Sequence, residues 1–346
     1  MAAGYSIPVA PFRWRDGERL ILFGRGRLAE APELAGSEYV VLSTPRAQAA
    51  APALLERARQ VHEVRLGRVD ELAGELRPAV RGQTLVALGG GRVIDVAKAL
   101  AAADPPRRVV AIPTTLSGAE MTSGHRHAAG VDPSTSGVRP AVVINDPALS
   151  ASQPPAELAQ SAGNALGHAI EGPTTPLCNP VATLAALQAA RLIAQGLSGP
   201  ELEDDARDAL GLGALLAGHA ISSTGYGLHH VVSQTLARFA GVGHGAANAI
   251  MLPESVRALR GRAPSWYFEA LTESLGSEPE AFAAGLRRLT GVPSLRAAGV
   301  TGEQLERCVA RASKRPELQM TPPPAGPEEL RELYTAAFQP VSHSDG

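Results

Sequence analysis

The chain has 346 residues, which is enough for two domains and for a core that needs no disulfide or metal to hold it. Its 32 basic and 34 acidic residues give a formal net charge of −2, which argues against nucleic acid or an anionic membrane as a partner. The two cysteines are far apart, and no apolar run is long enough to span a membrane. Residues 1–6 lack the basic and apolar regions of a signal peptide, so we expect a cytoplasmic protein.

The first 150 residues alternate between short apolar runs and segments of helical period. The apolar runs predict strands at residues 19–23, 39–43, 61–66, 84–88, 109–112 and 141–144. The intervening segments predict helices at residues 47–59, 69–76 and 92–103. Strands that alternate with helices indicate βαβ units, so we predict a Rossmann-like α/β domain with a mostly parallel sheet over residues 1–150.

After about residue 150 the strand signal stops, and the chain becomes rich in Ala and Leu at helical spacing. The predicted helices are residues 156–170, 181–195, 205–219, 228–240, 246–259 and 328–338. The change falls near the turn signal Asp146-Pro147. We therefore predict an all-helical second domain over residues 151–346.

A glycine turn joins the fourth predicted strand to the helix at residues 92–103. Its glycines are Gly89, Gly90 and Gly91. Glycines let the backbone approach a phosphate, and the free N–H groups and dipole of a helix N-terminus favour an anion. Lys98, one of only two lysines in the chain, follows in the helix three residues after Asp95. The same pattern also fits an ordinary tight turn with a surface ion pair.

A polar loop with adjacent threonines, Thr114 and Thr115, follows the next predicted strand. In an open α/β sheet, the loops at the carboxyl ends of the strands surround the ligand. Threonine hydroxyls in such a loop can donate to a phosphate or to a nicotinamide carboxamide. The alternative is a loop that only caps the segment after it.

Five of the nine histidines fall between residues 168 and 244. Asn164 and His168 are four residues apart and share a helix face, and His230 and Gln234 repeat that spacing. His244 follows in a corner flanked by glycines. A lone histidine on an apolar helix usually has a structural role. Three of them in one place can bind a divalent metal, transfer protons or bind a carboxylate.

Taken together, these motifs resemble the group III iron-containing alcohol dehydrogenase family, in its maleylacetate reductase branch. The family's Gly-Gly-Gly-Ser-x-x-Asp-x-x-Lys motif resembles residues 89–98, with Arg92 in place of serine. Its Pro-Thr-Thr-x-x-Gly-Ser-Glu loop resembles residues 113–120. The segments that carry the family's metal ligands resemble residues 162–171, 227–230 and 244–248. The motifs occur in the family's order along essentially the whole chain.

The resemblance implies the dehydroquinate synthase type of fold and an NAD(P)H-dependent reductase that acts as a homodimer. Its substrate would be a small carboxylated carbonyl or enone compound, bound in a cleft between the domains. The glycine turn, Asp95 and Lys98 would hold the phosphates of NAD or NADP, and Thr114 and Thr115 the nicotinamide end.

The resemblance assigns the substrate end to the histidine segments. The residues expected there as catalytic groups are His168, His230, His244, Gln234 and Asn164. The family's Fe or Zn is held by one Asp and three His, and here Asn164 stands at the Asp position. An amide is a poor ligand, which favours an enzyme without a metal, although His168, His230 and His244 can still bind Zn²⁺. Without a metal, an imidazolium at His230 or His244 is the expected proton donor.

Three departures from the family pattern favour a second reading, in which the fold is recruited to a cyclisation, elimination or isomerisation. They are Arg92 in the phosphate turn, Gln234 where the family has a histidine, and a shortened segment after residue 64. A non-catalytic scaffold is a third possibility, against which the retained Gly91, Asp95, Lys98 and histidines weigh. The residues leave the exact substrate and the choice between NADH and NADPH open.

Overall fold

The computed structural model describes residues 8–199 and 202–339, so the expectation for residues 1–6 lies outside the described part. The described residues form two compact units. Unit 1 takes in those of Met1–Gln153 and Gln195–Leu215, and unit 2 those of Pro154–Ala194 and Leu216–Gly346. The described residues of the range 195–215 thus group with the sheet. A domain boundary near residue 150 stays a prediction.

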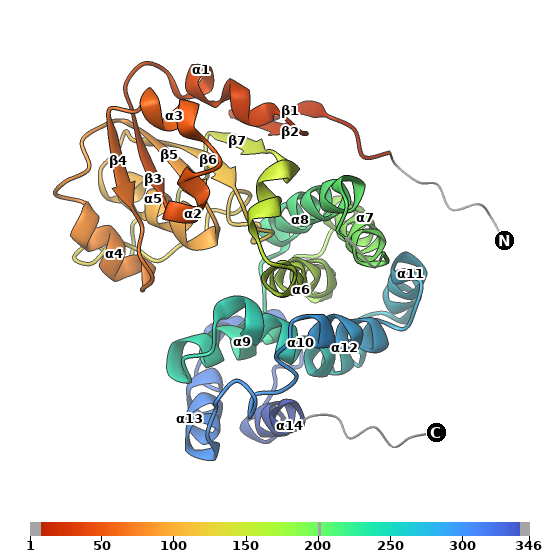
Figure 1. The fold of residues 1–346 in the computed structure, drawn as a ribbon. Coiled ribbons are helices and arrows are strands. Elements are labelled where there is room, and N and C mark those ends of the chain that lie inside the picture. Colours follow the sequence, from red (N-terminus) through yellow and green to blue (C-terminus); the bar gives the residue numbers. More distant parts are fainter. Residues whose placement is uncertain (1–7, 200–201, 340–346) are drawn as a thin grey trace. The chain divides into compact units, whose positions relative to one another are not determined.

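Within its described residues, unit 1 contains a seven-stranded sheet in the order β1-β2-β7-β6-β5-β3-β4 (Figure 1). The strands are β1 (Phe12–Asp16), β2 (Arg19–Phe23), β3 (Tyr39–Ser43), β4 (Gln60–Glu63), β5 (Thr84–Gly89), β6 (Arg108–Pro113) and β7 (Val142–Asn145). β1 pairs antiparallel with β2, and every other neighbouring pair is parallel. The mostly parallel sheet is therefore confirmed. β1 was not predicted, because its residues alternate between half-buried and exposed and carry little apolar signal.

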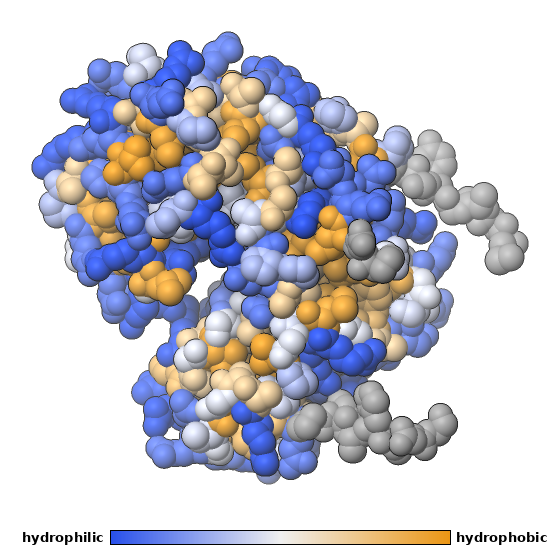
Figure 2. Space-filling view, viewed as in Figure 1, coloured by the Kyte–Doolittle hydropathy of each residue, from blue (hydrophilic) through white to orange (hydrophobic). Residues whose placement is uncertain are grey.

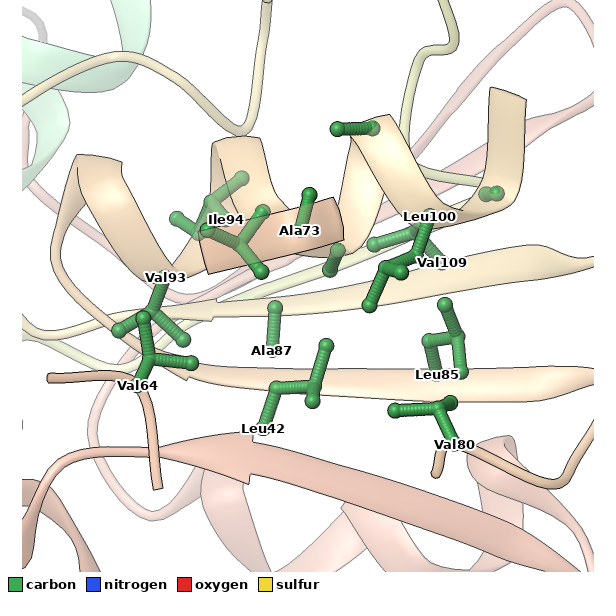
Figure 3. Packing of buried hydrophobic residues seen from close by; sticks show 14 of the residues in the cluster. Leu42, Val64, Ala73, Val80, Leu85, Ala87, Val93, Ile94, Leu100 and Val109 are labelled. Atoms are coloured by element: carbon green, nitrogen blue, oxygen red, sulfur yellow. The ribbon is translucent and has the colours of Figure 1, made fainter. Parts of the chain in front are cut away.

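Helices cover both faces of this sheet. They are α1 (Ala31–Ala35), α2 (Pro45–Gln48), α3 (Pro52–Glu56), α4 (Val69–Leu76) and α5 (Gly91–Ala103), with the 3-10 turns η1 (Arg27–Glu30) and η2 (Pro147–Ser152). α4 and α5 pack on the face that carries Leu42, and Figure 3 shows Ile94 and Leu100 of α5 above the strand residues. α1, α2 and α3 pack on the opposite face, which carries Val41. Adjacent strand residues point to opposite faces, so both faces of the parallel sheet are buried.

The single helix predicted over residues 47–59 is wrong, because the chain forms α2 and α3 there. Pro52 begins the second of them. Proline has no backbone N–H to donate to a continuing helix, whereas the first position of a new helix needs none.

Among its described residues, unit 2 contains helices and connecting loops but no strand, which confirms the predicted change of fold. Its helices are α6 (Pro155–Glu171), α7 (Pro180–Leu197, to residue 194), α8 (Asp204–Thr224, from residue 216), α9 (Leu228–Phe239), α10 (His244–Arg260), α11 (Ser265–Leu275), α12 (Pro279–Leu289), α13 (Gly302–Ala312) and α14 (Pro327–Phe338), with the turns η3 (Gly172–Thr174) and η4 (Pro316–Met320). α11, α12 and α13 were not predicted. The reciprocal capping box of Thr301 and Gln304 is the sequence signal that marks the start of α13.

α10 lies at the centre of unit 2 and packs against α6, α9 and α12. A Cβ at Gly163 would lie 3.0 Å from the Cβ of Ala249, so the glycine lets α6 and α10 approach closely. No helix in the described part is long and apolar enough to cross a membrane. On the face that Figure 2 shows, hydrophilic residues separate patches of hydrophobic ones.

Candidate functional site

The glycine turn and the threonine loop lie side by side at the carboxyl edge of the unit 1 sheet. β5 and β6 are parallel neighbours with Gly89 opposite Pro113, and the N–H of Thr114 donates to the Gly89 carbonyl over 3.0 Å. A Cβ at Gly90 would lie 2.9 Å from Cγ2 of Thr115, so the close approach of turn and loop requires a glycine there. The structure thus brings together Gly89, Gly90, Gly91, Thr114 and Thr115.

The helix that follows the turn has a strongly positive N-terminus. α5 begins at Gly91 with no side-chain cap and no acidic residue in its first turn. Arg92 lies in that first turn, its Nε is buried without a hydrogen-bond partner among the described residues, and burial lowers its pKa. A guanidinium beside the positive end of a helix dipole is unfavourable until an anion neutralises both. The turn therefore suits an anionic group such as a pyrophosphate.

Lys98 is completely buried, and protein acceptors surround its ammonium group. Nζ donates to Oδ1 of Asp95 over 2.8 Å, to the Ala119 carbonyl over 3.1 Å and to the Gly124 carbonyl over 2.7 Å. These bonds use all three protons of an ammonium group. Lys98 therefore ties α5 to the loop after β6. A direct contact of Lys98 or Asp95 with a cofactor stays a prediction.

The same loop buries a carboxyl group to which no role was assigned from the sequence. Glu120 is 1% exposed, and its Oε2 has no hydrogen-bond partner among the described residues. Arg19 donates to its backbone carbonyl over 2.8 Å. Burial raises the pKa of Glu120 to about 7, against the opposing effect of Lys98 and Arg19. At neutral pH this carboxyl is only partly ionised.

The predicted histidines meet in unit 2, where α6, α9 and α10 pack together. The rings of His168 on α6 and His230 on α9 are stacked, with centroids 4.7 Å apart and planes 14° apart. His244 begins α10, and its Nε2 lies 3.2 Å from Nδ2 of Asn248. Asn164 is buried on α6, one turn before His168. Nδ1 of His168 and Nε2 of His230 are buried and have no hydrogen-bond partner among the described residues. These two nitrogens can accept or donate a bond to a ligand.

Glu171, at the end of α6, was not predicted as a site residue. Its Oε2 lies 2.6 Å from Nδ1 of His230, and its Oε1 accepts from the backbone N–H of His229 over 2.6 Å. The carboxylate is 0% exposed. It comes three residues after His168 in the chain, and that spacing on one helix is the signal that could have found it.

The start of α9 is held from a second side by Thr321, which follows η4. The N–H of Leu228 donates to Oγ1 of Thr321 over 2.9 Å. A Cβ at Gly227 would lie 1.9 Å from the same oxygen, so only glycine fits there. α6 and the segment after η4 therefore together fix the backbone that carries His230.

Burial keeps the imidazoles of His168 and His230 neutral in the unliganded protein. It lowers the pKa of His230 to about 3, with His244 and Arg315 acting in the same direction. The pKa of His168 is lowered well below its usual range by burial and by the neighbouring histidines. Burial raises the pKa of Glu171, while His229 and the nearby backbone N–H groups oppose the rise. The imidazolium expected at His230 is thus not the resting state at neutral pH.

The cluster does not fit a bound metal ion. Imidazole lone pairs lie in the ring plane, so the nearly parallel rings of His168 and His230 direct theirs along parallel planes and not at one point. Asn164 supplies an amide where a divalent ion is best held by a carboxylate. Among the described residues, no group of three His, Cys, Asp or Glu side chains is arranged to hold a metal. We therefore derive no chemistry through a metal.

Gln234 lies one turn after His230 and is held by a polar network that the sequence did not reveal. Nη1 of Arg315 donates to Oε1 of Gln234 over 3.0 Å, and Arg315 also bonds Glu317 and the hydroxyl of Tyr226. Arginine only donates, so the amide oxygen faces it and the NH₂ group of Gln234 faces elsewhere. The Tyr226 ring lies 5.5 Å from the His230 ring, centroid to centroid. The network thus borders the histidines.

The comparisons with known proteins agree with this arrangement. The model of the iron-containing alcohol dehydrogenases matches residues 19–147, and the model of the C-terminal part of the Fe-containing alcohol dehydrogenase family matches residues 158–338. A maleylacetate reductase of Rhizobium sp. (strain MTP-10005) is 29% identical over 95% of this chain and 98% of its own. Maleylacetate reductase 1 of Rhodococcus opacus is 30% identical over 74% of this chain and 72% of its own.

A solved structure has the same fold. The crystal structure of maleylacetate reductase from Agrobacterium tumefaciens superposes with a TM-score of 0.81 and 28% sequence identity, over 94% of this chain and 97% of that one. Both units of the chain are matched by family models that together span nearly the whole described sequence. The chain therefore belongs to the iron-containing alcohol dehydrogenase family, in its maleylacetate reductase-like branch, and is an NAD(P)-dependent oxidoreductase.

Proposed function

We propose that the protein is an NAD(P)H-dependent reductase of a small carboxylated carbonyl or enone compound, of the kind that maleylacetate represents. The observation that carries the proposal is the stacked His168–His230 pair, in which each ring has one buried nitrogen that no described residue hydrogen-bonds. Buried polar atoms without a partner are rare in proteins and call for an explanation. An oxygen-rich substrate that accepts bonds at this point supplies one.

The cofactor is assigned to unit 1. Its pyrophosphate would bind at the N-terminus of α5, whose first turn has no side-chain cap and whose glycines Gly90 and Gly91 let the loop after β6 pack closely beside it. Arg92 would supply a counter-charge to the phosphates that the family's serine lacks. Thr114 and Thr115, beside the turn, would orient the nicotinamide.

A carboxylate substrate would also change the protonation state of the histidines. A neutral, buried imidazole becomes easier to protonate when an anion arrives beside it. Substrate binding would therefore be coupled to the uptake of a proton by His230, whose pKa is lowered to about 3 without ligand. The protonated ring can then donate through Nε2.

Reduction needs one hydride and one proton. NAD(P)H, held by the glycine turn and the threonine loop, would supply the hydride to the carbonyl carbon or to the β-carbon of the enone and be oxidised to NAD(P)⁺, which would leave a negative charge on the substrate oxygen. A hydrogen bond from Nε2 of His230 stabilises that oxygen, and its proton goes to the product. The rest of the substrate would be bound by His168, His244, Asn164 and the amide of Gln234.

A panel assay tests the proposal. Oxidation of NADH and of NADPH is followed by the nicotinamide absorbance with maleylacetate, other carboxylated enones and oxo acids, and the methyl ester of each. Turnover of the acids and little turnover of the matched esters is expected. If the protein oxidises neither cofactor with any acid, the proposal fails. A cofactor that binds but is not consumed while a substrate is converted would favour the non-redox alternative. Homodimer formation also stays a prediction, which light scattering tests.

A further inference from the structure

We propose that Glu171 is a positioning residue for His230: it holds Nδ1, so that Nε2 is the ring atom that faces the substrate. This inference rests on the proposed reductase reaction, in which His230 transfers the proton. Glu171 touches neither substrate nor cofactor in this proposal and acts only through the imidazole.

The contact between Glu171 and His230 is short and is buried from water. Oε2 of Glu171 lies 2.6 Å from Nδ1 of His230, closer than in an ordinary N–H···O hydrogen bond. The side chains are 0% and 4% exposed, so water does not compete for either partner. Such a bond sets both the orientation of an imidazole and the ring nitrogen that carries its proton.

The carboxylate itself cannot turn away, because its other oxygen is already fixed. Oε1 accepts from the N–H of His229 over 2.6 Å, and backbone N–H groups of Gly227 and His230 also act on the carboxylate. These groups belong to the N-terminus of α9, whose dipole opposes the rise in the pKa of Glu171 that burial causes. An ionised carboxylate only accepts, so in the proposed pair Nδ1 of His230 carries the hydrogen.

The backbone that carries the pair is held equally firmly. The His229 ring is bonded through Nδ1 to Oγ of Ser255 over 3.0 Å. Its Nε2 would lie 2.4 Å from a Cβ at Gly167, so the ring occupies the space that the glycine leaves. The result is a fixed imidazole with Nδ1 committed, and with Nε2 as the atom at which a proton is gained or lost.

The competing explanation is that Glu171 only caps α9. The substitution Glu171→Gln separates the two roles. The glutamine oxygen can still accept from His229, which preserves the cap. Its NH₂ group then faces Nδ1 of His230, which must become an acceptor, so the proton of the neutral ring moves to Nε2. A capping role alone predicts no change in the tautomer.

Nitrogen-15 NMR of the full chain with labelled histidine reads the tautomer directly, and a His230→Gln variant assigns the resonances. The Nδ1–H form is expected in the unsubstituted protein and the Nε2–H form in Glu171→Gln. An Nε2–H form in the unsubstituted protein overturns the proposal, and this measurement does not depend on how well any variant folds. The same tautomer in both proteins overturns it as well.

Kinetics supply the second readout. Glu171→Gln should lower kcat about tenfold or more while the Kd for NADH stays within a factor of two, as expected when a proton-transfer group is misoriented. Glu254→Gln is the matched control, because it neutralises another buried carboxylate of unit 2 that pairs with Arg257 and Arg287. It should leave kcat and the His230 resonances unchanged. An unaltered kcat in Glu171→Gln refutes the positioning role. If the tautomers are as expected but the unsubstituted protein reduces no substrate, the reductase proposal fails, and the orientation of the ring stands.

Discussion

Replacing Lys98 by methionine should destabilise unit 1 strongly. The substitution keeps most of the aliphatic volume and removes the ammonium that Asp95 and the carbonyls of Ala119 and Gly124 surround. Breaking a buried ion pair from one side costs about 3–5 kcal/mol, which is in line with losing two or more charged hydrogen bonds. For a unit of this size, that corresponds to a fall in Tm of roughly 6–20 °C.

Differential scanning calorimetry measures the effect, and urea unfolding gives the free energy independently. Lys314→Met is the matched control, since Lys314 is exposed and is the only other lysine in the sequence. It should move Tm by no more than a degree or two. A Lys98→Met protein as stable as the control would show that the buried contacts do not hold the loop. If the Kd for NADH rises at a temperature where the Lys98→Met variant is still folded, Lys98 also contacts the cofactor.

Three further outcomes follow from unit 1 and the histidine cluster. His230→Gln should lower kcat about a hundredfold with little change in the Kd for NADH, and the reverse pattern in stopped-flow kinetics and fluorescence titration would refute its place at the substrate end. Burial raises the folded pKa of Glu120 from 4.5 to about 7, so the folded protein keeps a proton that the unfolded chain has released between these values, and stability falls as pH rises through them. Glu120→Gln should remove this decline, roughly 3 kcal/mol by urea unfolding, and an unchanged pH profile would contradict it. A strong chelator should leave turnover unaltered because the stacked rings do not converge on an ion, whereas stoichiometric Zn or Fe by elemental analysis together with loss of activity would overturn that reasoning.

The sequence predicted the sheet and the two-part architecture well, because period and composition are local signals. β2, β3 and α4 form over the residues expected. The glycine turn and the threonine loop were also placed correctly at one edge, since parallel neighbours bring their carboxyl ends together.

What the sequence did not reveal depends on contacts between distant segments. Glu171 reaches His230 across 59 positions, and Arg315 reaches Gln234 across 81. The burial of Lys98 was missed for the same reason, because two of its acceptors are carbonyls of a later loop, and any residue type can supply a carbonyl. The neutral state of the histidines likewise follows from packing, which no spacing of residues encodes.

The hydrogen bond from Leu228 to Thr321 has a consequence for how the protein is made. α6, α9 and α10 precede Thr321 in the chain, so during synthesis the start of α9 lacks one of its two supports until this threonine has been made. A chain that stops short of this threonine would contain the glycine turn and every histidine of the cluster. The start of α9, which carries His230, would lack one of its two supports. The placement of His230 therefore depends on a segment that is made later, 93 positions after Leu228 in the chain.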